Sequence, residues 1–184
     1  MRNLKMLLSI GLLLQVFLCA SAADSHLDAF WTDKPPKLDG QMNDECWRNA
    51  PIATHFKVVG VDRQAKYQTQ ARVCYDAENL YVFLRGEGPP FTPTELGTGK
   101  GAKFQKSGEK LLEWDNLGLL LEIPHNQNVD CLFFATNPLA RRSDNRKAVL
   151  KGMDRFNPLK VRCSRGETGW NAEMIIPFMS LGSY

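Results

Sequence analysis

The sequence lacks most of the features by which enzymes are recognised. It contains three histidines, no HExxH pattern for a catalytic metal and no G-x-S-x-G turn for a nucleophilic serine. Its cysteines never form a C-x-x-C pair, which excludes a zinc ribbon and a thioredoxin-type redox site. We therefore expect a non-catalytic segment, without excluding a catalytic domain in a longer chain.

No apolar run after residue 20 approaches membrane-spanning length. The longest apolar run, residues 6–20, lies near the N-terminus. Arg2 and Lys5 precede the mostly apolar residues 6–20, and Ala20-Ser21-Ala22 supplies small residues for cleavage. This order is typical of a secretory signal peptide, and a bilayer span needs about 20 apolar residues. We predict a signal peptide at residues 1–22 and a secreted, periplasmic or cell-surface location. Leu18 before Cys19 disfavours lipidation.

The chain also has little excess charge of either sign. The chain has 23 Lys and Arg against 20 Asp and Glu, a net charge of +3, and losing Arg2 and Lys5 with the signal peptide lowers it to +1. Domains that bind nucleic acid are clearly basic, so we expect no such partner. About 160 residues remain after cleavage, enough for one domain with a single core.

Cleavage would also make the cysteine count even. Four cysteines remain after loss of Cys19: Cys46, Cys74, Cys131 and Cys163. In an exported chain this favours one or two disulfide bonds, and the sequence does not choose among the three connectivities. Buried free thiols are the alternative, because two of the four lie in apolar strand patterns.

Strand patterns separated by turns dominate the mature chain. Residues 69–75 alternate in polarity, residues 76–79 have turn composition, and residues 80–84 return as a partner strand. Further strands are expected at residues 52–61, 117–123, 129–136, 159–163 and 170–176. The almost continuous apolarity of residues 117–123 suggests a central strand, and Pro177 should end the last strand.

The one helix expected is short. Residues 43–47 offer Asn43 or Asp44 as an N-cap and Trp47 as an anchor in the first turn. With six or more strands, the pattern predicts an all-β fold, an antiparallel β-sandwich of immunoglobulin-like or jelly-roll-like type. We place an N-terminal tail at residues 23–34 and the sandwich at 35–184. Residues 86–110 predict a long surface loop.

Four segments carry most of the informative aromatic, acidic and turn residues. They are Pro36-Lys37-Leu38-Asp39-Gly40 with Asn43-Asp44-Glu45-Cys46-Trp47; Thr69-Gln70-Ala71-Arg72-Val73 through Tyr75-Asp76 to Asn79-Leu80-Tyr81-Val82; Trp114-Asp115-Asn116; and Gly169-Trp170-Asn171-Ala172-Glu173 to Ile176-Pro177-Phe178 and Leu181. Their order over residues 35–181 resembles the family 9 carbohydrate-binding modules and their relatives. The resemblance implies a module that binds polysaccharide or oligosaccharide and that can form the N-terminal part of a larger secreted enzyme.

The candidate sugar site lies around the end of the long loop. Trp114 stands beside the polar residues Asp115 and Asn116, so its ring is a candidate platform for a sugar, with a lid over the sandwich edge as the alternative. Phe91 could add a second apolar face, and Asn137 completes the predicted ligand-binding set. Trp47 and Trp170 have apolar neighbours and are expected in the core instead.

The chain departs from the family pattern at three places. Gly118 stands where sugar-binding members carry an acid, and Ala135, two positions before Asn137, stands where they carry a base. Their second aromatic ring and last strand would follow Tyr184, so we expect the sandwich to lack its last strand or strands. A structural module that has lost its ligand site is therefore one alternative.

A haem-binding redox domain of the same sandwich type is a second alternative. Its axial ligands would have to come from His55, His125 and Met153. Relatives also bind calcium through oxygen ligands, but no dense acidic spacing supports such a site here, so we predict no cofactor and no metal. The sequence does not identify the glycan or the oligomeric state.

Overall fold

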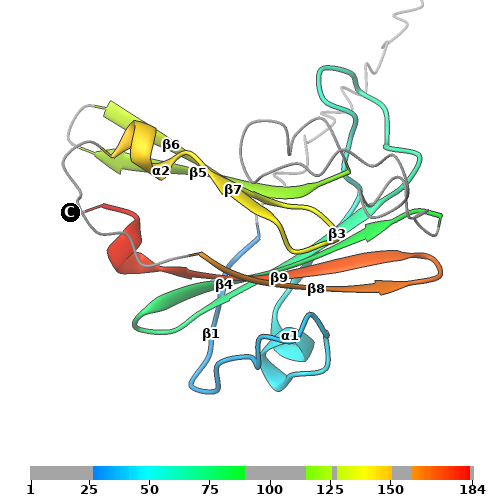
Figure 1. Ribbon diagram of the computed structural model, residues 1–184, viewed down its shortest axis with the longest axis horizontal. Helices are drawn as coiled ribbons and strands as arrows, with labels where there is room; N and C mark the ends of the chain where they lie inside the picture. The colour runs from blue at the N-terminus through cyan, green and yellow to red at the C-terminus, as the bar shows by residue number, and fades with distance from the viewer. Residues whose placement is uncertain (1–26, 90–114, 126–127, 151–158, 183–184) are drawn as a thin grey trace, which may run out of the picture.

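Two β-sheets stacked face to face form the body of the molecule (Figure 1). The structure is a computed structural model that describes residues 27–89, 115–125, 128–150 and 159–182. The larger sheet contains β1 (Phe30–Trp31), β2 (Ile52–Ala53), β3 (Thr69–Tyr75), β4 (Asn79–Glu87), β8 (Lys160–Gly166) and β9 (Gly169–Pro177). Its order is β1-β3-β4-β9-β8, and β2 also pairs with β3.

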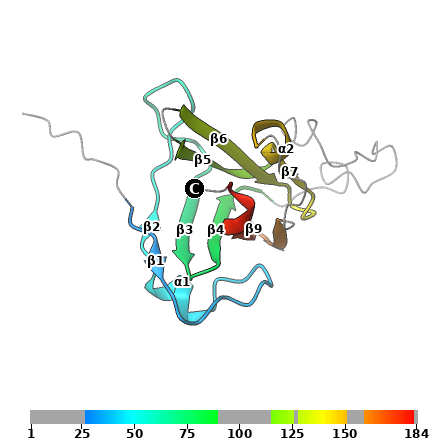
Figure 2. The same ribbon diagram turned by 90° about the vertical axis from the view of Figure 1, so that its left-hand side faces the viewer.

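The smaller sheet contains β5 (Leu117–His125), β6 (Asn128–Thr136) and β7 (Arg142–Asp144), in that order. A one-turn helix, α2 (Arg146–Val149), follows β7 on this side, and α1 (Glu45–Asn49) covers the opposite face of the larger sheet (Figure 2). The predicted β-sandwich with a short N-terminal helix is confirmed. The helix α2 was not expected, and β1 runs parallel to β3.

Two strand predictions need correction. Only Ile52 and Ala53 of residues 52–61 are in a strand; Lys57 then bridges to Gln64, with Gly60 at φ +80°, so these residues turn back on themselves instead of extending the sheet. Within the described part of the chain β5 has a neighbour on one side only, so it is an edge strand. Its Leu120 is 58 % exposed, so apolarity there did not mean burial on both faces.

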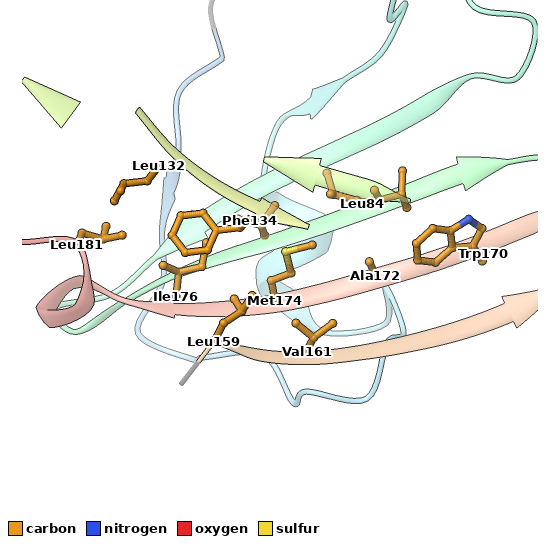
Figure 3. Packing of buried hydrophobic residues seen from close by; sticks show 12 residues of the cluster. Leu84, Leu132, Phe134, Leu159, Val161, Trp170, Ala172, Met174, Ile176 and Leu181 are labelled. Carbon is orange, nitrogen blue, oxygen red and sulfur yellow. The ribbon is translucent and has the colours of Figure 1, made fainter. Parts of the chain in front are cut away.

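The main core fills the space between the sheets (Figure 3). Alternation along β4 directs Val82 and Leu84 into this core, where they meet Phe134 from β6 and Met174 from β9. Trp170 at the start of β9 is 3 % exposed and belongs to the same cluster, as its apolar neighbours predicted. The body of the sandwich is therefore held by apolar burial between its two sheets.

A second core lies under α1. Tyr81 and Phe83 point from β4 to the face opposite the main core, where Cys46, Trp47 and Ala50 cover them. The Trp47 ring is fully buried, with its centroid 5.6 Å from that of Phe83, so its predicted role as a core anchor is confirmed. Asp44 is the N-cap residue of α1, but its carboxylate accepts a hydrogen bond from Lys37 N–H.

Candidate functional site

An open pocket of about 400 Å³ lies at one end of the larger sheet, where the end of β4 meets the turn between β8 and β9. Tyr67, just before β3, forms one side. The remaining lining residues are Arg85, Glu87, Gly88, Pro89, Glu167 and Thr168. An open pocket of this size offers room for a small polar molecule or for one unit of a longer chain.

The backbone joins three strand ends beneath this pocket. Glu87 N–H donates to Gln68 O at 2.9 Å, and Gly88 N–H donates to Thr168 O at 3.0 Å. Gly169 begins β9 with φ +145°, and a Cβ placed there would lie 2.1 Å from Gly86 O. Only glycine allows the β8–β9 turn to approach β4 so closely, and this approach brings Glu167 and Thr168 to the pocket.

The side chains of the pocket combine an apolar ring with charged groups of both signs. The side chain of Tyr67 is 50 % exposed, and Lys66 Nζ stands 5.0 Å from its ring centroid. Glu87 and Glu167 are exposed, and neither they nor the Arg85 guanidinium make a side-chain hydrogen bond or ion pair with another described residue. Carboxylates can accept hydrogen bonds from hydroxyl groups, a guanidinium can donate them, and the ring offers an apolar face.

Two of the sequence-predicted residues lie close to this end of the sandwich. Asp115 and Asn116 lead directly into β5, whose first residue, Leu117, packs over Gly86 of β4 on the face that meets the main core. Asp115 and Asn116 both have interaction partners in the structure. Their predicted role in ligand binding stays a prediction.

Asn137 follows β6 at the same end of the smaller sheet, because Leu117 and Thr136 are cross-strand partners. Its Oδ1 accepts hydrogen bonds from Leu139 N–H and Arg141 N–H, both at 3.0 Å. This amide therefore shapes the turn from β6 to β7, which gives it a structural task. Trp114 and Phe91, the two predicted aromatic platforms, lie outside the described residues.

Two of the departures from the family pattern lie side by side in the smaller sheet. Gly118 of β5 and Ala135 of β6 are direct cross-strand partners. A Cβ on Gly118 would lie 3.1 Å from the Phe133 ring and 3.1 Å from Phe134 O, so the ring already fills the space of a side chain. Where the resemblance implies an acid beside a base, this sheet presents two small uncharged residues.

The described residues supply no ligand set for the haem or calcium sites considered from the sequence. No group of three or more His, Cys, Asp or Glu residues in those ranges is arranged to hold a metal ion. His55 is exposed, with Nδ1 2.7 Å from Thr54 Oγ1; Met153 lies outside the described residues. All four described cysteines are free thiols, and no helix of the described chain is long and apolar enough to cross a membrane.

Comparison with solved structures identifies the architecture. Two structures of a family 9 carbohydrate-binding module from Caldicellulosiruptor kristjanssonii align with 82 % of this chain. The structure in complex with cellotriose gives a TM-score of 0.54 at 13 % identity over 67 % of its own chain, and the structure in complex with glucose gives 0.56 at 12 % over 69 %. The chain has the fold of a family 9 carbohydrate-binding module.

No protein-family model and no curated protein matches the chain. The family 9 fold confirms the resemblance drawn from the four sequence segments, and both neighbours are carbohydrate-binding modules. An identity of 12 to 13 % establishes the fold alone.

No local sequence pattern pointed to the residues that line the pocket. Tyr67 precedes a strand, Arg85 and Glu87 end one, and Glu167 lies in a segment interpreted only as a turn. Their proximity depends on the pairing of β3, β4 and β9, which brings together residues up to about 100 positions apart. The one available signal was a concentration of charged residues at the ends of otherwise apolar strands.

Proposed function

We propose that this chain is an exported, non-catalytic carbohydrate-binding module and that the pocket around Tyr67 binds one end or one unit of a polysaccharide or oligosaccharide. The observation that carries the proposal is the half-exposed ring of Tyr67 beside two carboxylates and a guanidinium in one open pocket. A sugar presents hydroxyl groups around its edge and C–H groups on its face, and this pocket offers partners for both.

The fold supports the same ligand class. Its two structural neighbours are carbohydrate-binding modules that were solved with cellotriose and with glucose. We therefore propose a neutral glucan as the first ligand to test. The charges at the pocket balance, with Glu87 and Glu167 against Arg85 in the lining and Lys66 beside Tyr67, and this balance suits an uncharged glycan.

Export and linkage to an enzyme complete the proposal. Residues 1–22 have the composition of a signal peptide, which would deliver the sandwich to a place where polysaccharide is available. A module of this kind, attached to a catalytic domain in a longer chain, would raise the local concentration of substrate around that domain without any chemistry of its own.

Affinity electrophoresis through gels that contain soluble glucans, followed by calorimetry with cellotriose and glucose, tests the binding. We expect retardation of the protein by at least one glucan, with at least a tenfold loss of affinity in Tyr67→Ala. Glu87→Gln and Glu167→Gln should each weaken binding severalfold, because an amide replaces a charged hydrogen-bond acceptor.

Trp31→Ala is the matched control. Trp31 is a comparably exposed aromatic residue (53 %), but it pairs beside Tyr75, at the far end of β3 and roughly 26 Å along the strand from Tyr67. The Trp31→Ala variant should bind glucans like the unmodified protein.

Trp114→Ala tests the sequence-based site separately. A loss of glucan affinity in that variant, with normal binding in Tyr67→Ala, would contradict a site at the pocket. Absence of binding to every glucan would favour a module without a ligand site.

A further inference from the structure

Two cysteines from distant parts of the sequence meet in the core beneath α1. Cys46 on α1 is 1 % exposed and Cys74 on β3 is fully buried, and both belong to the cluster formed with Trp47, Tyr81 and Phe83. The two thiols lie close enough for each to shift the pKa of the other. Since α1 packs directly on β3, the contact joins a helix to the sheet that it covers.

We propose that Cys46 and Cys74 form the disulfide bond of this protein and that Cys131 and Cys163 remain thiols. The proposal selects one of the connectivities left open by the sequence. It relies on the proposed export only for the place where oxidation would occur, because an oxidising compartment is where such bonds persist.

The other two cysteines are placed too far apart to pair with each other. Cys163 on β8 lies against the start of the β6–β7 turn, with Sγ 3.8 Å from Thr136 Oγ1 and 3.4 Å from Asn137 O. Cys131 lies five residues before Thr136 along β6, a separation of roughly 16 Å. A disulfide requires Cα atoms within about 7 Å, so a bond between them would need the strand to leave the sheet.

Cys163 is also separated from Cys46 and Cys74 by the larger sheet. It packs against the main core between the sheets, whereas Cys46 and Cys74 lie in the second core on the other face. Cys131 is exposed on the smaller sheet. Cys46 and Cys74 are therefore the two described cysteines that share one buried cluster, which is why we assign the bond to them.

The oxidation would take place before α1 docks. Burial raises the pKa of both thiols, so in the folded protein neither is readily available as the attacking thiolate. In the folding chain, one thiolate attacks the disulfide of an oxidised donor such as glutathione disulfide and forms a mixed disulfide. The second cysteine then attacks the protein sulfur. The Cys46–Cys74 bond forms, the donor leaves as two thiols, and the protein loses two electrons and two protons.

Such a bond would restrain the segment that carries the pocket aromatic. Cys46 and Cys74 bracket residues 47–73, which include β2, the turn at Gly60 and Tyr67. Closing this loop removes conformational freedom from the unfolded chain and so stabilises the folded one. The bond would fix α1 on the sheet without contributing any atom to the pocket.

Refolding the full chain in a glutathione buffer, followed by alkylation in denaturant and peptide mass spectrometry, tests the connectivity independently of export and of sugar binding. Without reductant, we expect the peptides of Cys46 and Cys74 to be joined and those of Cys131 and Cys163 to be alkylated. Reduction before alkylation should modify these four cysteines, and Cys19 as well where the signal peptide is retained. Complete alkylation of Cys46 and Cys74 without reductant, or a bond to any other cysteine, overturns the proposal.

Thermal unfolding with and without reductant provides a second readout. The unmodified protein and Cys131→Ala/Cys163→Ala should each lose several degrees of midpoint temperature on reduction before unfolding. Cys46→Ala/Cys74→Ala should show no dependence on reductant. An equal dependence in both double variants would overturn the assignment. If either variant fails to fold, the mass spectrometry of the unmodified chain still decides.

Discussion

The indole N–H of Trp47 on α1 donates a 3.0 Å hydrogen bond to Oε1 of Glu173, a carboxylate on β9 with no exposed surface. The other oxygen, Oε2, accepts two backbone hydrogen bonds of 2.8 Å, from Asp39 N–H and Gly40 N–H. One buried acid therefore joins a turn, a helix and a central strand. Gly40 has φ +79°, and a Cβ there would lie 2.9 Å from Ser164 N, so the turn requires glycine.

Removing the indole donor should destabilise the protein. Trp47→Phe keeps an aromatic ring but leaves Glu173 Oε1 buried without its partner, which costs about 1–3 kcal/mol. Urea unfolding measures the change. Trp31→Phe is the matched control, since Trp31 is exposed and should change the free energy of unfolding by less than about 0.5 kcal/mol. Equal effects in the two variants would contradict a structural role for this hydrogen bond.

Stability should depend on pH through Glu173. Burial raises its pKa above the ordinary 4.5, and the hydrogen bonds from Gly40, Trp47 and Asp39 only partly offset this. The native state thus holds the proton more tightly than the unfolded state. The contribution of Glu173 to stability is complete below about pH 4.5 and is lost as pH rises through the native pKa.

Glu173→Gln isolates this contribution because glutamine does not titrate. The free energy of unfolding of the unmodified protein, minus that of the variant, should fall as pH rises from about 4 to neutrality, as measured by urea unfolding at several pH values. A difference that grows with pH would mean that the three N–H donors hold the anion and that the native pKa is depressed.

Asp76 should show the opposite pH dependence. Burial alone would raise its pKa, but hydrogen bonds from Tyr81 O–H and from the N–H groups of Glu78 and Asn79 outweigh burial and lower it. Its contribution is present above pH 3.8 and is lost as pH falls through the native pKa. Asp76→Asn should cost about 1–2 kcal/mol at neutral pH and progressively less in acid. A cost independent of pH would show that the charge is unimportant.

Gly169→Ala should be severely destabilising. The added Cβ would lie 2.1 Å from Gly86 O, at a φ of +145° that other residues rarely adopt, so we expect a cost of about 3 kcal/mol or more. Gly60→Ala is the control, because Gly60 also has a positive φ but no atom within 4 Å, so only the backbone strain of about 1–2 kcal/mol remains. Similar unfolding midpoints for the two variants would contradict the close approach.

Local patterns predicted much of the fold. The alternation in residues 69–75 coincides with β3, and Pro177 ends β9 as expected of a residue without an N–H donor. The pattern in residues 52–61 failed because β-branched residues favour extended backbone, but the positive φ at His55 and Gly60 turns the chain away from the sheet. Continuous apolarity in β5 likewise could not reveal how many neighbours the strand has.

The residues of the candidate site were harder to predict from the sequence than the fold. The ligand-binding role of Asn137 stays a prediction, and the sequence did not show that its Oδ1 accepts hydrogen bonds from two backbone N–H groups of the next turn. Tyr67 and Glu167 become neighbours only through the pairing of three strands, and no local pattern reports such long-range pairing. The resemblance gave the fold correctly, whereas the site depends on side chains that differ between proteins of one fold.

The most direct test of a carbohydrate site at this pocket is to titrate isotope-labelled protein with cellotriose and to follow the chemical shifts of its backbone amides. We expect the largest changes in chemical shift at the backbone amides of Gly88, Thr168 and Tyr67, and no change at Trp31 and Tyr75 at the far end of β3. Changes confined to the far end of the sheet, or no change at saturating concentrations of any glucan tested, would contradict a carbohydrate site at this pocket.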